Sequence, residues 1–496
     1  MKIESDISQG LPVFHMVGLL SSEVREARER VRTALKNIGH PLPYGRITIS
    51  LSPADLKKEG ARFDLAIAVA LLINMNIIHE GSVREFLIIG ELGLNGDVKG
   101  IHGVLPIIIM AKQQGFRYCM VPYENAAEGS VVDDIQIVPV RDLYEATEYL
   151  NGKTELPIKK GFALRDKGSD KILNDCSGDM SEIYGHTMAK RAAAVAAAGK
   201  HNLLMIGPPG AGKSMLASRI PGIMPDMSME ERMEISGIHS ICGILKEGGL
   251  VTRRPFRAPH PGITLPALVG GGTYPKPGEL TIAHGGVLFF DELPEFHPGV
   301  LDALRQPLEE RKVRVVRNGG NYEFPADCLF VGAMNPCKCG FFPDRNKCNC
   351  SGADIRRYLG RISGPFLDRM DMCIDVPRQS IEDMEDRKTL QAEESSGKIK
   401  ERIDRAVQIQ FQRNNGKYNS QMTVNQVKKF CILDDAGNRL IHNAYQKFSL
   451  SMRSYYKIIK TARTIADLEG SEDISQRHLG EALGYRIGSG KYNTIF

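Results

Sequence analysis

The pattern of apolar and polar residues changes twice along the chain, and each region predicts a different kind of structure. Within residues 1–151, short β-rich runs at Arg46–Leu51 and Phe86–Gly90 alternate with helical patterns at Asp64–Ile73 and Val104–Gln114. Short strands that alternate with amphipathic helices predict a mixed α+β domain for this region.

The middle of the chain predicts an α/β core over residues 171–380. A helical pattern at Thr187–Ala198 is followed by the continuous apolar runs Leu203–Ile206, Gly286–Phe290 and Leu329–Met334. Apolar runs without alternation are typical of strands that are buried on both faces of a parallel sheet.

The end of the chain predicts helices rather than strands. From about Ile381 the composition changes to charged amphipathic patterns, which include Ser451–Gly470 and Ser475–Tyr485. We therefore expect a helical domain over residues 381–496. Gly152–Gly168 is rich in Lys, Gly and polar residues, and it predicts a linker over residues 152–170.

A glycine-rich loop with one lysine follows the first apolar run of the core. Such a loop turns its backbone N–H groups inward around phosphates, its lysine reaches the β- and γ-phosphates, and its serine hydroxyl binds Mg²⁺. The sequence therefore predicts a nucleoside triphosphate site formed by Gly207, Pro208, Pro209, Gly210, Ala211, Gly212, Lys213 and Ser214.

Two acids follow the second apolar run. Asp291 and Glu292 come directly after Gly286–Phe290, and ligands bind at the carboxyl ends of parallel strands. We expect Asp291 to bind Mg²⁺ together with Ser214, and Glu292 to polarise the attacking water, because phosphoryl transfer to water depends on positioning and charge neutralisation.

The overall composition sets wider bounds. The 496 residues exceed a single core and predict roughly three domains. With 42% hydrophobic and 25% charged residues, no apolar stretch long enough for a bilayer and no leader, the sequence predicts a cytoplasmic protein without membrane contact. The net charge of +5 permits nucleic-acid binding without requiring it.

Four of the ten cysteines lie close together, in two CxC pairs. Four thiolates brought together by a turn fit a closed, structural tetrahedral Zn²⁺ site, although CxxC is the commoner spacing. Zinc binding and free thiols both remain open for Cys337, Cys339, Cys348 and Cys350.

Two basic segments are candidates for contact with nucleic acid. Arg311–Arg317 followed by Asn318–Asn321 predicts a hairpin whose alternating basic residues share one face. Thr252–Arg257 combines arginines with one phenylalanine, which suits phosphate binding and base stacking. Either segment could instead be a solvated face or a subunit interface.

Taken with the loop and acids above, three longer motifs make the chain similar to the AAA+ ATPases related to the magnesium-chelatase ATPase subunit, in the ComM (YifB) branch. They are Arg254-Pro255-Phe256-Arg257-Ala258-Pro259-His260, Asp291-Glu292-Leu293-Pro294-Glu295-Phe296, and Arg361-Ile362-Ser363-Gly364-Pro365-Phe366-Leu367-Asp368-Arg369-Met370-Asp371. The resemblance covers nearly the whole chain. It implies a hexameric, ring-forming ATPase, and the branch is regarded as a DNA motor for branch migration in natural transformation.

The resemblance also implies roles for further residues. Asn335 matches the sensor-1 residue that orients the water, Arg369 the arginine finger that serves the neighbouring subunit, and Arg453 the sensor-2 arginine. For each arginine, a surface ion pair is the alternative. Ile183 and Tyr184 lie where this class packs its adenine, although such a pair is equally typical of plain core.

The amino-terminal third resembles the Lon-protease-type domain, through Asp55–Gly60, Gly90-Glu91-Leu92 and Ile101–Pro106. A Lon-type protease needs a serine nucleophile and a lysine base. Arg62 and Leu105 occupy the corresponding positions here, so we expect a structural or interaction domain and no peptidase. Family members usually have one more strand before the equivalent of Ile3, which predicts an incomplete first sheet edge.

These inferences predict an ATPase that uses ATP and Mg²⁺, with Zn²⁺ as a candidate structural ion. Its expected partners are single-stranded or branched DNA bound without sequence preference, further copies of the same chain and recombination proteins. A chelatase-like ATPase that remodels a protein partner is the alternative, and an ATP-dependent protease is disfavoured by the missing dyad.

Overall fold

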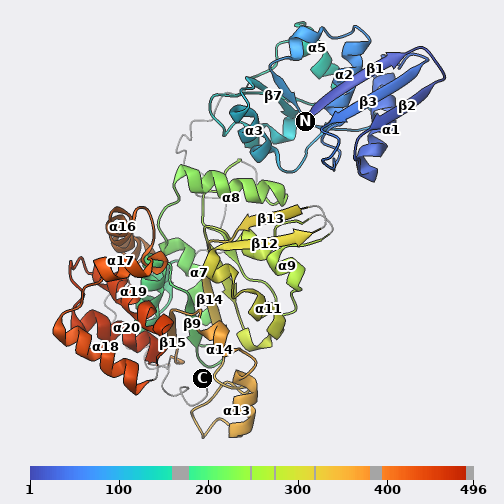
Figure 1. The fold of residues 1–496 in the computed structure, drawn as a ribbon. Helices are drawn as coiled ribbons and strands as arrows, with labels where there is room; N and C mark the ends of the chain where they lie inside the picture. The colour runs from blue at the N-terminus through green and yellow to red at the C-terminus, as the bar shows by residue number, and fades with distance from the viewer. Residues whose placement is uncertain are drawn as a thin grey trace. The chain divides into compact units, whose positions relative to one another are not determined.

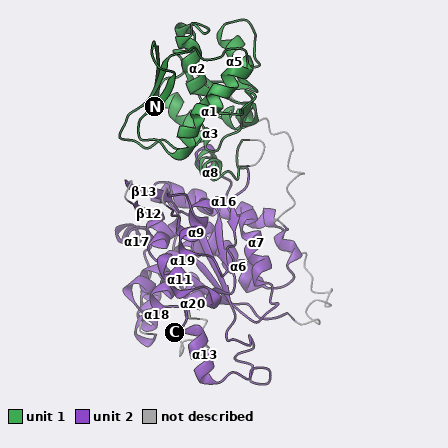
Figure 2. Ribbon diagram, turned by 90° about the vertical axis from the view of Figure 1, so that its right-hand side faces the viewer, with its two compact units in different colours: residues 1–169, 232–251 green, residues 170–231, 252–496 purple. Residues whose placement is uncertain are grey.

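The computed structural model describes residues 1–158, 178–245, 249–272, 275–317, 320–379, 394–448 and 450–487. The chain forms two compact units, which Figure 2 colours separately. The first contains Met1–Ser169 and Arg232–Val251, and the second contains Asp170–Glu231 and Thr252–Phe496. The predicted linker lies largely outside the described residues.

The first unit begins with a three-stranded sheet in the order β1-β3-β2, formed by β1 (Lys2–Ser8), β2 (Val13–Val17) and β3 (Arg46–Ser52). Strand β3 is antiparallel to β1 and parallel to β2. Two helices, α1 (Ser22–Asn37) and α2 (Asp64–Asn74), share its core. Helix α1 forms because the Ser21 side chain caps it and because its apolar residues recur every three or four positions.

A second sheet of the same unit is parallel, in the order β4-β7-β8. The other elements of this unit are α3, α4 and α5, a two-stranded ribbon and two short 3₁₀ turns. The bounds are β4 (Phe86–Ile88), β5 (Glu91–Leu92), β6 (Val98–Lys99), β7 (Tyr118–Pro122), β8 (Gln136–Val140), α3 (Val104–Gln113), α4 (Ala126–Gly129), α5 (Leu143–Leu150), η1 (Glu80–Val83) and η2 (Tyr123–Asn125). The predicted strands and helices of this region are confirmed, with small shifts of their ends.

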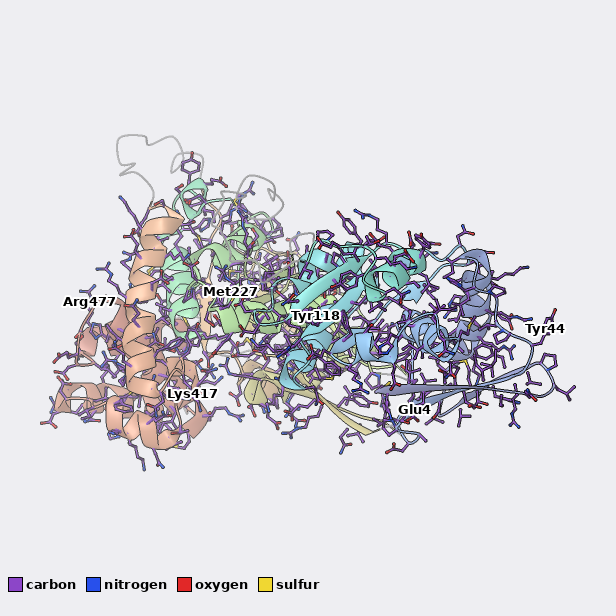
Figure 3. The ribbon with its side chains drawn as sticks, turned by 90° about the horizontal axis from the view of Figure 1, so that it is seen from above. Glu4, Tyr44, Tyr118, Met227, Lys417 and Arg477 are labelled. Carbon is purple, nitrogen blue, oxygen red and sulfur yellow. The ribbon has the colours of Figure 1, made fainter. Side chains whose placement is uncertain are left out.

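The chain returns to the first unit over Arg232–Val251. This segment contains most of helix α8 (Met229–Ile241). Within that unit, Met233 packs against the core around α3, and the Ser240 hydroxyl donates to Glu128. Tyr44, in the loop before β3, is fully exposed (Figure 3).

The core of the second unit is a five-stranded sheet in the order β10-β11-β14-β9-β15, in which every pair is parallel. Its strands are β9 (Leu203–Ile206), β10 (Phe256–Arg257), β11 (Val287–Phe290), β14 (Leu329–Met334) and β15 (Met372–Asp375). Strands β9, β11 and β14 are buried along their whole length, which confirms the reading of their apolar runs.

Helices cover the sheet, and a hairpin precedes β14 (Figure 1). Helix α6 is buried over ten residues because its alanines let neighbouring helices approach closely. The bounds are η3 (Met180–Glu182), α6 (Thr187–Gly199), α7 (Lys213–Ile223), α9 (Leu265–Val269), α10 (Glu279–Ile282), η4 (Leu293–Glu295), α11 (Pro298–Ala303), α12 (Pro307–Glu310), β12 (Lys312–Arg317), β13 (Gly320–Pro325), α13 (Gly352–Leu359) and α14 (Gly364–Leu367).

The predicted helical end of the chain gathers on one side of this unit (Figure 1). It contains α16 (Ser396–Asn414), η5 (Asn419–Gln421), α17 (Val424–Phe430), α18 (Asp435–Lys447), α19 (Met452–Leu468) and α20 (Gln476–Ile487). Asp467 is 3% exposed and pairs with Arg413 and Arg463, which compensates the buried charge. Among the described residues, no helix has the length and apolarity needed to cross a membrane.

Candidate nucleotide-binding site

Strand order brings the predicted phosphate loop and its acids to one edge of the sheet. Strand β14 lies between β9 and β11, so the residues that follow these three strands are neighbours. The Gly207 N–H donates to the Met334 carbonyl at 3.1 Å, which fixes the loop beside Asn335. We call Gly207–Ser214, Asp291, Glu292 and Asn335 the phosphate edge.

Glycine is required within this loop. Gly210 and Gly212 have φ of +73° and +78°, where other residues are strained. A Cβ built on Gly207 would lie 2.1 Å from the Val376 carbonyl oxygen. The glycines therefore allow both the turn of the loop and its close approach to the chain after β15.

Lys213 is the first residue of α7 and is 7% exposed. Its Nζ donates to the Gly207 carbonyl at 2.7 Å, to the Pro208 carbonyl at 2.9 Å and to Asn335 Oδ1 at 3.1 Å. Burial lowers the pKa of Lys213, and the charges of Asp291 and Glu292 act in the opposite sense. The ammonium group is thus held at the centre of the loop and in contact with the predicted sensor residue.

Ser214 and Asp291 form a pair of oxygen ligands. The Ser214 hydroxyl donates to Asp291 Oδ2 at 2.5 Å, and Asp291 Oδ1 accepts from the Glu292 N–H at 2.9 Å. Mg²⁺ prefers a hydroxyl and one or two carboxylates together with phosphate and water. The two side chains therefore fit the predicted Mg²⁺ site, with the hydroxyl and carboxylate exchanging their mutual hydrogen bond for the ion.

Glu292 has a left-handed backbone, with φ of +51°, and its side chain is exposed. A residue other than glycine in this region costs on the order of 1–3 kcal/mol, and such strain concentrates at functional sites. The turn places Glu292 directly after Asp291 in the chain, and the Glu292 N–H donates to Asp291. Its role in polarising the attacking water stays a prediction.

The predicted adenine residues differ in their surroundings. Ile183 is 4% exposed and belongs to the core around α6, whereas Tyr184 is 55% exposed. Their contact with adenine stays a prediction.

His186 is a residue that the sequence reasoning missed. A Cβ built on Gly212 would lie 3.9 Å from His186 Nε2, so the ring lies beside the phosphate loop. Its buried Nδ1 has no hydrogen-bond partner among the described residues, and burial, followed by the charge of Lys190, lowers its pKa. Its backbone is left-handed just before α6, with φ of +51°. The sequence pattern gives no sign of this conformation, so it could not have identified His186 as a neighbour of the phosphate loop.

Arg369 and Arg453 meet at one carboxylate. Arg369 Nε lies 2.9 Å from Glu309 Oε1, and an Arg453 guanidinium nitrogen lies 2.6 Å from the same oxygen. All three residues line a cavity of about 1160 Å³, which we call the arginine cavity. None of the described residues that line it belongs to the phosphate loop.

Helices α19 and α20 hold the loop that carries Arg369. Lys457 Nζ donates to the Asp368 carbonyl at 2.7 Å and pairs with Asp371 at 3.0 Å, and Arg486 donates to the Met370 carbonyl. Burial lowers the pKa of Lys457, which Asp371 partly offsets. Sequence motifs singled out Arg369 but not this support, because Lys457 is distant in the chain.

The floor of the arginine cavity is a buried ionic network. Lys200 is 4% exposed and lies 2.9 Å from Asp327, which also pairs with Arg311. Burial by itself would raise the pKa of Asp327, but the charges of Lys200 and Arg311 lower it well below its usual range. The sequence analysis had placed Arg311 on the basic face of the hairpin. That prediction is wrong, because Arg311 belongs to this network.

Within the basic loop Thr252–Arg257, the fold engages Arg254, Phe256 and Arg257, which corrects their reading as candidate DNA contacts. Arg253 is exposed, and its contact with DNA stays a prediction. Arg254 is buried and donates to the carbonyls of Pro225 and Gly285 and to Glu231. Arg257 makes two 2.6 Å bonds to Glu279, and Phe256 stacks on Phe289. These partners occupy the groups that the prediction assigned to phosphate and base.

The predicted hairpin is confirmed as β12 and β13. Lys312 and Arg314 are exposed and alternate with the buried Val313 and Val315. Both basic residues pair with Glu323 of β13, at 2.5 Å and 3.2 Å, and Arg314 also pairs with Glu310. Arg317 is exposed at the end of the strand, and the turn at 318–319 lies outside the described residues.

The four predicted cysteines come together. All four Sγ atoms lie within 4.8 Å of one another. Cys337 and Cys348 are buried, and Cys339 and Cys350 are partly exposed. The arrangement could hold a metal ion among thiolates.

The positions that would carry a Lon-type dyad contain no nucleophile and base. Leu105 is fully buried in α3, and Arg62 lies just before α2. The absence of peptidase activity stays a prediction.

The parallel sheet, the glycine loop and the oxygen pair together define a phosphate-loop nucleotide-binding core of the AAA+ type. Residues 179–384 match the family described as magnesium chelatase, subunit ChlI, residues 3–125 match subunit ChlI of Mg-chelatase, and residues 393–486 match the ChlI C-terminal family.

Individual relatives agree with this class. The chain is 42% identical to "Competence protein ComM" of Haemophilus influenzae, over 98% of this chain and 94% of that protein. It is 39% identical to "Uncharacterized protein YifB" of Escherichia coli, over 98% and 93%. Shorter matches are to "Lon protease 2" of Bacillus subtilis, 33% identical over 24% of this chain and 21% of that protein, and to "DNA repair protein RadA" of Aquifex aeolicus, 31% identical over 18% of each.

This chain belongs to the ComM/YifB family of magnesium-chelatase-like proteins. The family implies an ATPase that uses ATP and Mg²⁺.

Proposed function

We propose that this protein is an ATP-hydrolysing ring motor that acts on DNA, as a branch-migration helicase in natural transformation or recombination. The observation that carries the proposal is the separation of two sets of charged groups. Lys213, Ser214 and Asp291 meet at the phosphate edge, whereas Arg369 is held on Glu309 in the arginine cavity. An arginine that supports hydrolysis from a different surface fits action on the neighbouring subunit of a ring.

Within one site, each residue has a separate task. Lys213 would neutralise the β- and γ-phosphates, and Ser214 and Asp291 would hold Mg²⁺, which supplies further positive charge to the phosphates. Glu292 accepts a proton from water as the water oxygen bonds to the γ-phosphorus, and the bond from that phosphorus to the bridging oxygen breaks to release ADP. Asn335 orients the water, because its side chain already contacts Lys213.

The two arginines act from outside this set. We propose that Arg369 follows the charge that develops on the γ-phosphate of the adjacent subunit, because a planar, permanently charged fork suits that task. Arg453 shares the same carboxylate, so we propose that it responds to the same neighbour rather than acting alone. Hydrolysis would then require assembly into a ring, for which we propose six subunits.

The DNA assignment is supported by the hairpin and by two relatives. Lys312, Arg314 and Arg317 are exposed basic residues on or at the end of β12. The relatives carry the names competence protein and DNA repair protein. With no base-reading motif, we propose that the protein binds single-stranded or branched DNA through phosphates, without sequence preference and with recombination proteins as partners.

We also propose a cytoplasmic location and a structural Zn²⁺ at the four cysteines. Four thiolates form a closed coordination shell, so this ion supports the fold and takes no part in hydrolysis.

The test is DNA-stimulated hydrolysis. ATP turnover of the wild-type protein would be measured without DNA and with single-stranded, forked and four-way DNA, with the Glu292→Gln protein as the control for contaminating activity. We expect stimulation by branched DNA and branch migration of the four-way DNA in the same reaction. If wild-type protein assembled with ATP binds none of these DNAs at low salt, the proposal is overturned.

A specific observation favours one alternative, an ATPase that remodels a protein partner. Glu323 and Glu310 pair with the basic residues of the hairpin, so its face is partly neutralised and could contact protein instead. Hydrolysis that is stimulated by a protein partner and unaffected by any DNA would support this alternative.

A further inference from the structure

The segment Cys337–Cys350, which we call the cysteine knuckle, has the geometry of a metal site rather than of a disulfide. The Sγ atoms of Cys337, Cys339 and Cys348 are separated by 3.3, 3.5 and 3.8 Å. Four sulfurs about 2.3 Å from a tetrahedral Zn²⁺ lie about 3.8 Å apart, whereas bonded sulfurs lie about 2.05 Å apart.

The backbone of the knuckle supports this arrangement. The Phe342 N–H donates to Cys337 Sγ at 3.4 Å, the Gly340 N–H to the Cys337 carbonyl at 3.0 Å, and the Cys348 N–H to the Asp344 carbonyl at 2.8 Å. These tight turns return the second CxC pair to the first. The ligands are thus brought together by local hydrogen bonds.

The knuckle touches the phosphate loop directly. Gly340 has φ of +86°, and a Cβ built on it would lie 2.3 Å from Pro209 Cδ and 2.8 Å from Pro209 Cγ. Its backbone therefore lies against the ring of Pro209, at a place where only glycine fits.

A second connection runs through the chain itself. Asn335 precedes Cys337 by two residues, and its Oδ1 accepts from Lys213. The knuckle therefore meets the phosphate edge on both sides, at Pro209 through space and at Lys213 through Asn335. Ser214 and Asp291 hold each other through their own hydrogen bond, in which no residue of the knuckle takes part.

We propose that the cysteine knuckle binds one Zn²⁺ and that the metal-bound knuckle holds the phosphate loop in its nucleotide-binding shape, so that loss of the metal weakens nucleotide binding. The inference rests on the proposed function only for the identity of the nucleotide. Without the ion, four thiols pack less tightly, Gly340 moves away from Pro209, and the loop loses a rigid wall. With the ion, that wall is fixed, because Zn²⁺ binding closes the turn.

The first experiment measures metal and nucleotide separately. Zinc content would be determined by elemental analysis, and the Kd of a fluorescent ATP analogue by titration without hydrolysis, for wild type and for the double variant Cys337→Ser with Cys350→Ser. We expect close to one Zn²⁺ per chain in wild type, loss of zinc in the double variant, and a Kd at least about tenfold higher, a size typical of strongly coupled contacts.

A second experiment separates the contact from the metal. Gly340→Ala adds one methyl group against Pro209 and removes no sulfur ligand, but its φ of +86° also strains the turn. Zinc content is therefore measured for this variant as well, and we expect retained zinc with a raised Kd. In the Pro209→Ala background the same change should cost less, because the ring it meets is absent; this double-mutant cycle measures the coupling. Lys338→Ala is the matched control, since Lys338 is exposed within the knuckle and should change neither quantity.

The outcomes are distinct. A wild-type protein without zinc when prepared without chelators overturns the metal site. The link to the phosphate loop is overturned if the nucleotide Kd stays unchanged after zinc loss or in the Gly340→Ala protein. It is also overturned if the double-mutant cycle shows no coupling between Gly340 and Pro209. A zinc-loaded wild-type protein that binds no nucleotide overturns both the link and the proposed function, whereas normal nucleotide effects without DNA stimulation count against the DNA motor alone.

Discussion

The phosphate edge and the arginine cavity are both built from charged groups of the second unit, but their charges have different numbers of partners. Lys213 has three acceptors at the phosphate edge, and Ser214 and Asp291 hold each other. In the arginine cavity, Arg369 and Arg453 share one exposed carboxylate, that of Glu309. The first region has the composition of a site that binds its ligand within one chain.

The arginine cavity has charged groups that could contact the surface of another molecule. The Arg453 side chain is 45% exposed, so its ion pair with Glu309 contributes about 0–1 kcal/mol and can be exchanged for another anion at little cost. Arg369 is more buried and also donates to the Pro365 carbonyl at 2.6 Å, so it is held more firmly. A buried network beneath them, with Lys200, Asp327 and Arg311, keeps their supports fixed. We therefore propose that nucleotide binding belongs to one subunit and that hydrolysis needs two.

The largest expected effects are at the phosphate edge. Lys213→Ala should abolish tight ATP binding, because the triphosphate loses its principal counter-charge. Glu292→Gln should bind ATP and not turn it over. Nucleotide affinity by titration and turnover by phosphate release distinguish the two, and wild-type hydrolysis by the Glu292→Gln protein would refute the role of Glu292.

The second prediction tests whether the arginine cavity acts on a different subunit from the phosphate edge. Arg369→Ala should leave the nucleotide affinity of each subunit nearly intact and lower turnover by on the order of 10³-fold, because the arginine serves the adjacent site. Mixing it with the Glu292→Gln protein should restore some hydrolysis, since one interface then has both groups. Mixed rings without recovery would count against action across subunits.

Two controls sharpen this experiment. Arg357→Ala removes an arginine that is paired with Asp354 in α13 but is much more exposed than Arg369, and it should leave turnover unchanged. Glu309→Gln should retain at least wild-type turnover, because it releases both arginines without removing either. A loss of turnover in Glu309→Gln would instead make the pairing itself part of the active state.

Below the arginine cavity, His201 gives a pH-dependent prediction. Its ring is 1% exposed, contacts Thr464 at 2.8 Å and lies near Asp371, and burial lowers its pKa from 6.5 to about 4. Because the folded-state pKa lies below the unfolded value, the stability it contributes is complete above pH 6.5 and is lost as the pH falls toward 4.

The loss amounts to about 3 kcal/mol, at 1.36 kcal/mol for each pKa unit. Denaturant unfolding of wild type and His201→Gln between pH 7 and 4 measures it. The difference in unfolding free energy between the two proteins should shrink toward acid pH. An unchanged difference would show that His201 does not remain neutral in the fold.

The sequence predicts the phosphate edge almost completely because its parts are local. Each residue directly follows a buried apolar strand, and the parallel order of the strands brings the three ends together. The roles of these residues stay predictions, since geometry alone does not measure catalysis. The arginine cavity could not be predicted, because Glu309, Arg369 and Arg453 meet only through the folded arrangement.

Two further differences between the sequence predictions and the structure also arise from contacts that form only in the folded chain. Thr252–Arg257 has the composition of a nucleic-acid contact, but Arg254 is satisfied by carbonyl groups of Pro225 and Gly285, which no side-chain pattern reveals. Residues Arg232–Val251 belong to the first unit. The amino-acid composition does not change at the ends of this segment, so the sequence does not reveal that it leaves the second unit. The domain boundaries at residues 151, 170 and 380 stay predictions.

The smallest expected effect concerns the hairpin, which lies outside both regions. Changing Arg314 and Arg317 to Ala should weaken DNA binding and DNA-stimulated turnover and spare basal hydrolysis, because neither residue contacts the phosphate edge. Each lost phosphate contact should also make the fall of log affinity with log salt shallower by about one unit in each engaged subunit.

Arg314 should contribute the smaller part, since Glu323 and Glu310 already pair with it, whereas exposed Arg317 donates to the Val316 carbonyl. The single variants therefore test whether a cation must first leave a carboxylate to bind DNA. Arg357→Ala with Arg477→Ala is the matched control, because it removes the same charge from α13 and from the exposed face of α20 (Figure 3). Equal salt slopes for the control and the hairpin variant would show that the hairpin contributes only net charge, and the DNA contact would then have to lie on another surface.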